Sequence, residues 1–326
     1  MKLIFKWLFN LVAKKNYMQI KILVTGSNGL LGQKLVYKLK ADKHVSLIAT
    51  ARGENRLIDK EGYVYESLDI TKFENVKSVF EKHKPDVVIN TAAMTNVDAC
   101  ETQREEAWLM NATAVEHQVK VLENLKSNSY NPHFIHLSTD FIFDGTHGPL
   151  TEEEKPNPLS YYAETKLEAE RIVLASKLKW AIARTVLVYG IVDNMSRSNI
   201  VLWVKQNLEQ GKAINVVDDQ FRTPTLAEDL ADGCILIAEK GAEGIFNISG
   251  KDFYSIIDLA YVVADYYKLD KSLIKPSKSS DIKQPAVRPP KTGFIIDKAR
   301  KILGYNPHSF TEGIKLMEEQ ILRMKN

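Results

Sequence analysis

The sequence predicts an α/β fold, in which a doubly wound parallel sheet carries a smaller, mostly helical domain at its carboxyl edge. Three observations support this prediction. Short apolar stretches alternate with helical ones from residue 19 to residue 185, the first apolar stretch ends in a glycine-rich turn, and the alternation stops after Gly190. Repeated strand–helix units of this spacing indicate parallel strands with helices on both faces.

Each expected element follows from the period of its apolar residues. A short continuous apolar run indicates a buried strand, and apolar residues three or four positions apart indicate a helix. The expected strands are 19–25, 44–50, 63–66, 86–90, 134–138 and 180–185, and the expected helices are 30–40, 72–83, 101–126 and 159–176. Beyond residue 190 we expect a helix at 199–210, a strand at 214–217, a helix at 226–240, a strand at 244–249, and mostly helix from residue 255.

The composition is that of an ordinary soluble globular protein and excludes several functional classes. Of the 326 residues, 44% are hydrophobic and 26% are charged, and the net charge of +3 comes from scattered basic residues, so no nucleic-acid-binding surface is indicated. Cys100 and Cys234 stand far apart without a C-x-x-C pattern, which fits a reducing, cytoplasmic compartment. The seven histidines show no metal-binding spacing, so we expect no metal site.

The first 17 residues differ in character from the rest of the chain. They place Lys2, Lys6 and Lys14 on one helical stripe with apolar residues elsewhere, and their uncharged run is too short to span a bilayer. Two interpretations stay open: an interfacial amphipathic helix, which would bring membrane contact, or sequence upstream of a start at Met18. The second is favoured, because the core pattern begins directly after Met18.

The turn TGSNGLLG, residues 25–32, joins the first expected strand to the first expected helix. Gly26 permits the tight turn, Gly29 lets the backbone approach a pyrophosphate, and Gly32 lets the helix pack on the strand. A glycine triplet also occurs in plain turns, but here a strand precedes it and an amphipathic helix follows it. The motif predicts dinucleotide binding on a Rossmann-type sheet, and its G-x-x-G-x-x-G spacing is typical of the short-chain dehydrogenase variant.

The end of the second expected strand bears on the choice between NADP and NAD. Sites without a 2′-phosphate usually carry an acidic residue about 20 residues after the glycines, but here Arg52 stands at that place. A guanidinium can pair with a 2′-phosphate, so NADP is favoured and NAD stays possible; the alternative is a solvated surface arginine. Asp69, after the third strand, is placed to meet the adenine, although it could equally cap the turn at Thr71.

The stretch SYYAETK, residues 160–166, contains a Y-x-x-x-K spacing at the start of an expected helix. Residues four apart on a helix share a face, so Tyr162 lies beside Lys166 while Tyr161 points elsewhere and packs or lines the pocket. A free phenol has a pKa near ~10, and a neighbouring ammonium should lower it toward the working range of a proton donor. The pattern predicts Tyr162 as the acid catalyst and Lys166 as the residue that adjusts its pKa.

The strand before that helix ends in hydroxyl side chains, in the stretch HLSTDFIFDG. A hydroxyl beside Tyr162 can hold a substrate carbonyl oxygen, and Thr139 is favoured over Ser138 for this role. Such a Ser-Thr-Asp stretch is also common as a plain turn. Its occurrence in the right order with the glycine turn and the Tyr162–Lys166 pair favours a dehydrogenase-type site.

These motifs together resemble the extended short-chain dehydrogenase/reductase superfamily, and more narrowly the dTDP-4-dehydrorhamnose reductase family. The resemblance runs from Met18 nearly to the C-terminus and includes KPDVVINTAAMTNVDACE, PNPLSYYAETKLEAE, RTVLVYG, DDQFRTPT, the Arg288–Pro289 pair and DKARKILGYNP. It implies reduction of a nucleotide sugar at a C4 ketone with NADPH or NADH, with dTDP-4-dehydrorhamnose as the favoured substrate. It further implies a nucleotide-sugar partner and a possible homodimer.

The resemblance also assigns roles to residues and boundaries to domains. Thr139, Tyr162 and Lys166 would form the catalytic triad, supported by Asn111. We expect a cofactor domain at 18–190, rejoined by 226–249, and a substrate domain at 191–225 and 250–326. The cofactor-binding residues would be Gly26, Asn28, Gly29, Leu30, Gly32, Arg52, Asp69, Ile70, Ala92, Ala93, Tyr162 and Lys166, and the substrate-binding residues Ser138, Asp140, Gln220, Thr223 and Arg288.

Three features depart from the family pattern. The glycine turn reads GLLG where the reductases more often carry Gln after the middle glycine, Leu187 stands where a Trp is common, and the segment between Thr50 and Asp69 is long. These features also suit the regulatory β subunits of methionine adenosyltransferase and the nucleotide-sugar epimerases. Both therefore stay open as alternative functions.

Overall fold

The computed structural model describes residues 19–194 and 198–325, without the side chains of residues 324 and 325. Both interpretations of the first 17 residues concern a segment outside these ranges. Within them, no helix combines the length and the apolar character needed to cross a membrane.

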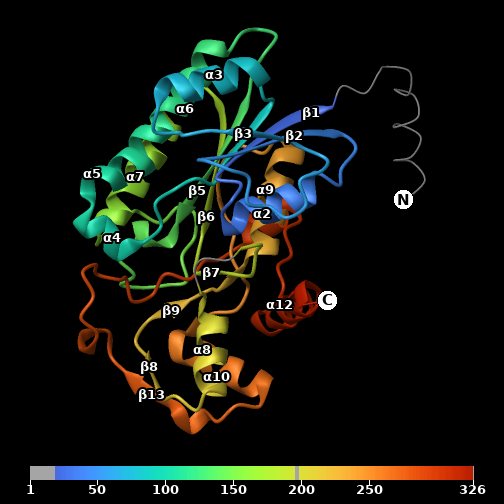
Figure 1. Cartoon of the computed structure of the whole chain (residues 1–326). Coiled ribbons are helices and arrows are strands. Elements are labelled where there is room, and N and C mark those ends of the chain that lie inside the picture. Colours follow the sequence, from blue (N-terminus) through green and yellow to red (C-terminus); the bar gives the residue numbers. More distant parts are fainter. Residues whose placement is uncertain (1–18, 195–197, 326) are drawn as a thin grey trace.

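A seven-stranded parallel sheet forms the centre of the molecule (Figure 1), in the order β11-β6-β5-β4-β1-β2-β3. The chain runs from β1 outward to β3, returns to β4 beside β1, and then continues to the opposite edge. The strand order therefore reverses between β1 and β4, and in sheets of this kind ligands bind at the carboxyl ends of the strands at such a point. The predicted fold class is confirmed. The strands are β1 (Ile20–Thr25), β2 (Val45–Ala51), β3 (Val64–Ser67), β4 (Val87–Asn90), β5 (His133–Thr139), β6 (Lys179–Thr185) and β11 (Gly244–Asn247).

Helices cover both faces of the sheet and bury its alternating apolar side chains (Figure 1). On one face Val36, Leu230 and Leu303 join the sheet core, and on the other Phe80 and Val173 do so. The first face carries α2 (Leu30–Leu39), α9 (Ala227–Lys240) and α11 (Asp297–Leu303), and the second carries α3 (Phe73–His83), α6 (Ala114–Leu125) and α7 (Tyr161–Ala175). Although α11 lies far from the other sheet helices in sequence, between α10 and α12, it packs with the sheet.

The single helix expected at 101–126 is wrong, because the chain is interrupted twice. Gln103 leaves helical geometry, with φ −114° and ψ 52°, and separates α4 (Val97–Thr102) from α5 (Arg104–Trp108). A π-helical turn, η1 (Leu109–Thr113), then connects α5 to α6. Such turns are frequent at functional sites, and this one contains the candidate residue Asn111.

A second group of elements lies beyond the carboxyl end of the sheet (Figure 1) and has a hydrophobic core of its own, which includes Val204, Val263 and Phe310. Its helices are α8 (Ile200–Glu209), α10 (Ile256–Tyr267) and α12 (Phe310–Lys325). The strands pair as β7 (Val188–Tyr189) with β10 (Thr225–Leu226), β9 (Phe221–Arg222) with β12 (Tyr254–Ser255), and β8 (Ile214–Val217) with β13 (Ile274–Ser277). The 3₁₀ turns η3 (Lys271–Leu273) and η4 (Ser279–Asp281) belong to this group, whereas the 3₁₀ turn η2 (Asp140–Ile142) directly follows β5 of the central sheet.

Candidate active site

The glycine turn between β1 and α2 is packed so closely that Gly26 and Gly32 have no room for a side chain. Gly26 has φ +69°, and a Cβ on it would lie 2.9 Å from the Ala92 backbone; a Cβ on Gly32 would lie 2.2 Å from the Gly26 carbonyl oxygen. Gly29 is the N-cap of α2, and no side chain caps that helix. Backbone N–H groups at such a helix start bind anions. The turn therefore fits the pyrophosphate of a dinucleotide.

The Asn28 side chain serves the loop that follows β2. Its amide donates to the Glu54 carbonyl oxygen at 2.8 Å, and its oxygen accepts from the Arg56 backbone N–H at 2.9 Å. From the other side, Asn194 donates to the Arg56 carbonyl oxygen at 3.1 Å. Asn28 was predicted to contact the cofactor, but its side chain holds this loop in place.

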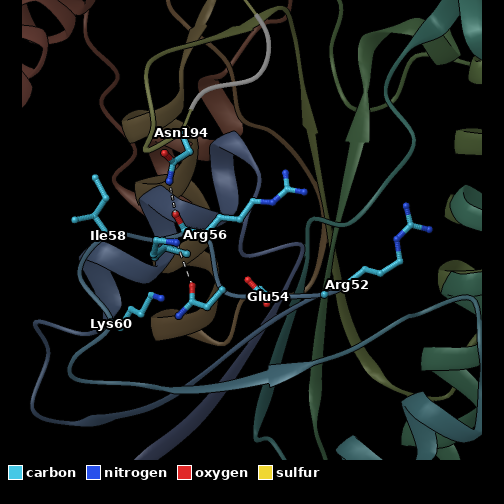
Figure 2. A pocket seen from close by; sticks show the side chains of 9 residues that line it. Arg52, Glu54, Arg56, Ile58, Lys60 and Asn194 are labelled. Atoms are coloured by element: carbon cyan, nitrogen blue, oxygen red, sulfur yellow. Dashed lines mark hydrogen bonds between the residues drawn. The ribbon is translucent and has the colours of Figure 1, made fainter.

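The loop lines a polar pocket of about 630 Å³ at the end of β2, shown in Figure 2. The guanidinium groups of Arg52 and Arg56 both extend away from the loop backbone, and Lys60 adds a third basic side chain. Sequence reasoning identified Arg52 alone, because Arg56 lies within a loop whose course depends on Asn28. The pocket has the charge that a 2′-phosphate requires.

Asp69 performs one of its two predicted roles, the capping of the turn at Thr71, and it also lies near Arg52. Its carboxylate accepts hydrogen bonds from the Thr71 backbone and hydroxyl, at 3.1 and 2.6 Å, so it does hold the turn after β3. Burial works to raise the pKa of Asp69, but the bonds from Thr71 and the charge of Arg52 lower it overall. Asp69 is thus ionised and close enough to Arg52 for their charges to interact. The neighbouring Ile70 is buried.

Helix α7 begins at Tyr161 because two side chains bind its first N–H groups. The Ser160 hydroxyl accepts from Ala163 N–H at 3.4 Å, and the Glu101 carboxylate accepts from Tyr161 N–H at 2.7 Å. This start places Tyr162 in the first turn and Lys166 in the second. Both side chains are buried, at 8% and 4% exposure.

The two adjacent tyrosines have different surroundings, as predicted. The Tyr161 ring lies against Trp108, and the Arg104 guanidinium stands 4.6 Å from its centre. The Tyr162 ring meets Phe141 edge to face and belongs to a small buried cluster with Cys100. Tyr161 therefore packs near the surface, whereas Tyr162 faces the interior at the end of β5.

The pKa shift predicted for Tyr162 is wrong in direction. Burial raises the pKa of Tyr162 above its ordinary value, and Asp140 and Cys100 add to the rise; a hydrogen bond with the Thr139 side chain opposes it. Lys166 does not offset this, since its ammonium donates to the Leu137 carbonyl oxygen at 2.6 Å. Burial also lowers the pKa of Lys166 to about 8, against an opposing effect of Glu170.

The end of β5 brings Ser138, Thr139 and Asp140 to the site, all buried. The Thr139 hydroxyl donates to Asp140 at 3.1 Å and accepts from Phe141 N–H at 3.2 Å, while the Ser138 hydroxyl has no partner among the described residues. Asp140 also accepts from Thr292 and lies 3.6 Å from the buried Arg222. Burial raises the pKa of Asp140, opposed by Arg222.

Arg222 is a site residue that sequence reasoning missed. It is 3% exposed and donates to the carbonyl oxygens of Pro289 and Pro290, at 2.7 and 3.1 Å. It therefore joins β9 both to the segment that carries Arg288 and to Asp140. Its position inside the quoted stretch DDQFRTPT was the available signal.

Asn111 connects the loop after β4 to α7. Its amide donates to the Met94 carbonyl oxygen and to the Thr165 hydroxyl, both at 3.0 Å, and its oxygen accepts from Met94 N–H at 2.7 Å. The π-helical turn directs this side chain inward. Asn111 thus holds Thr165, the neighbour of Lys166 on α7, against the loop after β4. Ala92 and Ala93 follow β4 and reach the same edge of the sheet.

The remaining predicted substrate residues lie on the second group of elements and already have partners. Gln220 donates to Ser279 at 2.9 Å, and the Thr223 hydroxyl donates to Ser249 at 3.1 Å. Arg288 forms a two-point ion pair with Asp98 of α4, at 2.7 and 3.1 Å. This ion pair ties the segment around Arg288 to α4, next to the central sheet.

Comparisons with known proteins agree with this geometry. The RmlD substrate binding domain family matches residues 20–323. A solved dTDP-4-dehydrorhamnose reductase from Clostridium acetobutylicum is 29% identical with a TM-score of 0.80, over 93% of this chain and 100% of that one.

Two curated relatives are each 30% identical. One is methionine adenosyltransferase 2 subunit beta of Xenopus tropicalis, matched over 78% of this chain and 75% of that protein. The other is a probable dTDP-4,6-dihydroxy-2-methyloxan-3-one 4-ketoreductase of Streptomyces antibioticus, matched over 82% and 84%. The chain therefore belongs to the RmlD substrate binding domain family, within the extended short-chain dehydrogenase/reductases that its sequence resembles.

Proposed function

We propose that this protein is an NADPH-dependent reductase of 4-keto nucleotide sugars, with dTDP-4-dehydrorhamnose as the favoured substrate. The observation that carries the proposal is the buried group Thr139, Tyr162 and Lys166 at the carboxyl end of the sheet, on the side reached by the glycine turn. The similarity to a solved dTDP-4-dehydrorhamnose reductase and to a probable 4-ketoreductase supports the same reaction class.

The raised pKa of Tyr162 suits reduction. Bound NADPH supplies the hydride for C4, and the carbonyl oxygen must then gain a proton. A buried phenol keeps its proton across the neutral range, so Tyr162 is in the form that can donate it. The Thr139 hydroxyl hydrogen-bonds the same oxygen, after turning from Asp140, and Lys166 holds the nicotinamide ribose.

The second group of elements closes the substrate side. Arg222, the Arg288–Asp98 pair and the Thr292–Asp140 bond fix the segment at residues 286–292 against α4 and the end of β5. We assign the nucleotide part of the substrate to this side, near Gln220 and Thr223. Arg288 can take up a diphosphate only by leaving Asp98, so substrate binding and opening of that ion pair are coupled in this proposal.

The test is the loss of NADPH absorbance with a panel of 4-keto nucleotide sugars. A reductase consumes NADPH in a 1:1 ratio with a substrate of the panel. A regulatory subunit of the kind found among the relatives binds NADPH without consuming it, and an epimerase returns its hydride and shows no net oxidation. Either of the last two results would overturn the proposal.

A further inference from the structure

A buried histidine lies directly behind the candidate catalytic lysine. His136 stands in the middle of β5, is 1% exposed, and has polar neighbours at both ring nitrogens. Its Nδ1 lies 3.1 Å from Nδ2 of Asn90, and its Nε2 lies 3.4 Å from Nζ of Lys166. Parallel pairing of β4 with β5 places Asn90 opposite His136, so the sheet register fixes this arrangement.

The hydrogen bonds around Asn90 decide which end of its amide faces the histidine. Its Oδ1 accepts from the Thr25 hydroxyl at 2.6 Å and from the Gln118 amide at 3.3 Å. Thr25 can donate there, because its own oxygen accepts from Ala92 N–H at 3.4 Å. With the oxygen occupied by two donors, the NH₂ group of Asn90 points at His136.

The orientation of Asn90 in turn decides the tautomer of His136. A ring nitrogen that accepts a hydrogen bond carries no proton, so Nδ1 is unprotonated. Burial and the charge of Lys166 lower the pKa of His136 well below its ordinary value, so the ring is neutral. The one proton of the neutral ring is therefore on Nε2, which faces Lys166.

We propose that His136 is a positioning residue whose Nε2–H faces the amine of Lys166 and favours its neutral form. The lone pair of a neutral amine can accept a hydrogen bond from the Nε2–H, whereas an ammonium has no lone pair. This contact therefore opposes protonation of Lys166. Lys166 also donates to the Leu137 carbonyl oxygen at 2.6 Å, a bond that an amine N–H and an ammonium N–H can both make. Lys166 thus changes charge near neutral pH and is not a permanent cation.

The other groups around Lys166 are consistent with this role. Glu170, one turn along α7, favours the ammonium, but its two oxygens are bound by Arg184 of β6 at 2.9 and 2.7 Å. Tyr162, one turn before, is neutral at the same pH because burial raises its pKa. Burial lowers the pKa of Lys166 itself to about 8. Neither Glu170 nor Tyr162 therefore presents a free negative charge that would keep Lys166 protonated.

The consequence for catalysis rests on the proposed function of Lys166. If the ammonium holds the nicotinamide ribose, NADPH binding and turnover both weaken as pH rises through about 8. The tautomer of His136 and the titration of Lys166 need neither substrate nor turnover. Failure of the proposed reductase activity and failure of this inference therefore give different results.

The test uses NMR on the full chain without added ligand. Nitrogen-15 spectra report the tautomer of His136, and carbon-13 labelled lysine reports the titration of Lys166, whose signal is the one missing in Lys166→Arg. We expect the Nε2–H tautomer and a lysine that titrates near pH 8. An Nδ1–H tautomer, or a Lys166 that titrates with the surface lysines, would overturn the proposal without any histidine variant.

A matched pair of variants isolates the contact. His136→Gln places an amide that can turn its carbonyl oxygen to the ammonium, so the Lys166 pKa should rise by about one pH unit, a roughly tenfold change in the amine-to-ammonium ratio. His133→Gln makes the same change in the same strand, at a buried residue three positions away, and should leave Lys166 unchanged. Equal titration of Lys166 in both variants would contradict the role of His136.

Discussion

The two ends of the candidate site differ in burial and in charge. At the end of β5 and the start of α7, Thr139, Tyr162 and Lys166 are buried, and burial is the main cause of the pKa shifts of Tyr162 and Lys166. At the end of β2, Arg52 and Arg56 are exposed on a loop around an open polar pocket (Figure 2). One end places a phenol and an amine in a buried environment, and the other exposes positive charge to solvent.

The difference decides what kind of reasoning works at each end. A guanidinium in water keeps its charge whatever its neighbours are, so residue type alone predicts what Arg52 can bind. A buried phenol or amine responds to every nearby dipole and to the loss of water, so residue type and spacing fix its place but not its pKa. The wrong direction predicted for Tyr162 is an example of this limit.

The largest expected effect is at the buried end. Tyr162→Phe keeps the ring packed against Phe141 and removes only the hydroxyl. We expect kcat to fall about 10²–10⁴-fold, the usual contribution of a positioned proton donor, with NADPH affinity nearly unchanged. Steady-state kinetics and cofactor titration of the variant measure both quantities.

Tyr161→Phe is the matched control for that variant. The neighbouring phenol lies against Trp108 and Arg104 at the edge of the buried cluster, so its loss should change kcat by no more than a few-fold. If Tyr161→Phe were the inactive variant and Tyr162→Phe kept near-parental turnover, the assignment of the acid would be reversed.

Acid pH should lower the free energy of unfolding through the buried histidines of β5. Burial lowers the pKa of His133 to about 4 and that of His136 well below 6.5, so the unfolded chain takes up protons that the folded chain refuses. The stability from these neutral histidines is present above pH 6.5 and is lost as pH falls below it, at about 1.4 kcal/mol per pH unit for each. Urea unfolding at several pH values between 7 and 5 measures how steeply the free energy of unfolding falls with pH. This pH dependence should be weaker in His133→Gln than in the parent, and an equal pH dependence would exclude this cause.

The smallest expected effect is at the exposed end. Arg52→Ala should weaken NADPH but not NADH, because the charge-assisted bond exists only with the 2′-phosphate. We expect a loss of roughly tenfold in the NADPH preference, with solvent screening keeping it below the value for a buried pair. Arg56→Ala should do the same if both arginines contact the phosphate. Equal affinity of the parent for the two cofactors would contradict the basis of this prediction.

Most of the fold was predictable because its signals are local. The strand and helix periods, the glycine turn and the serine that caps α7 each lie within a few consecutive residues. The interruption of the expected helix at 101–126 was not predictable, since the turn at Asn111 depends on hydrogen bonds to Met94 and Thr165, which are distant in sequence.

The same distinction applies to the site. Tyr162, Lys166 and Thr139 were found from spacing and order along the chain. His136 falls within the strand expected at 134–138, but its role depends on Asn90 across the sheet and Lys166 on the next helix, so the sequence did not indicate it. Arg222 likewise reaches Asp140 through a fold that brings β9 to the end of β5.

The central claim is that Tyr162 protonates a carbonyl oxygen while hydride reaches C4 of a keto sugar. The most direct measurement follows deuterium from C4-deuterated NADPH into the product by mass spectrometry and NMR. We predict one deuterium at C4 of the reduced nucleotide sugar, formed by the parent and Tyr161→Phe and about 10²–10⁴-fold more slowly by Tyr162→Phe. Bound NADPH that never transfers its deuterium to any 4-keto nucleotide sugar, or equal transfer rates in the two tyrosine variants, would contradict the account.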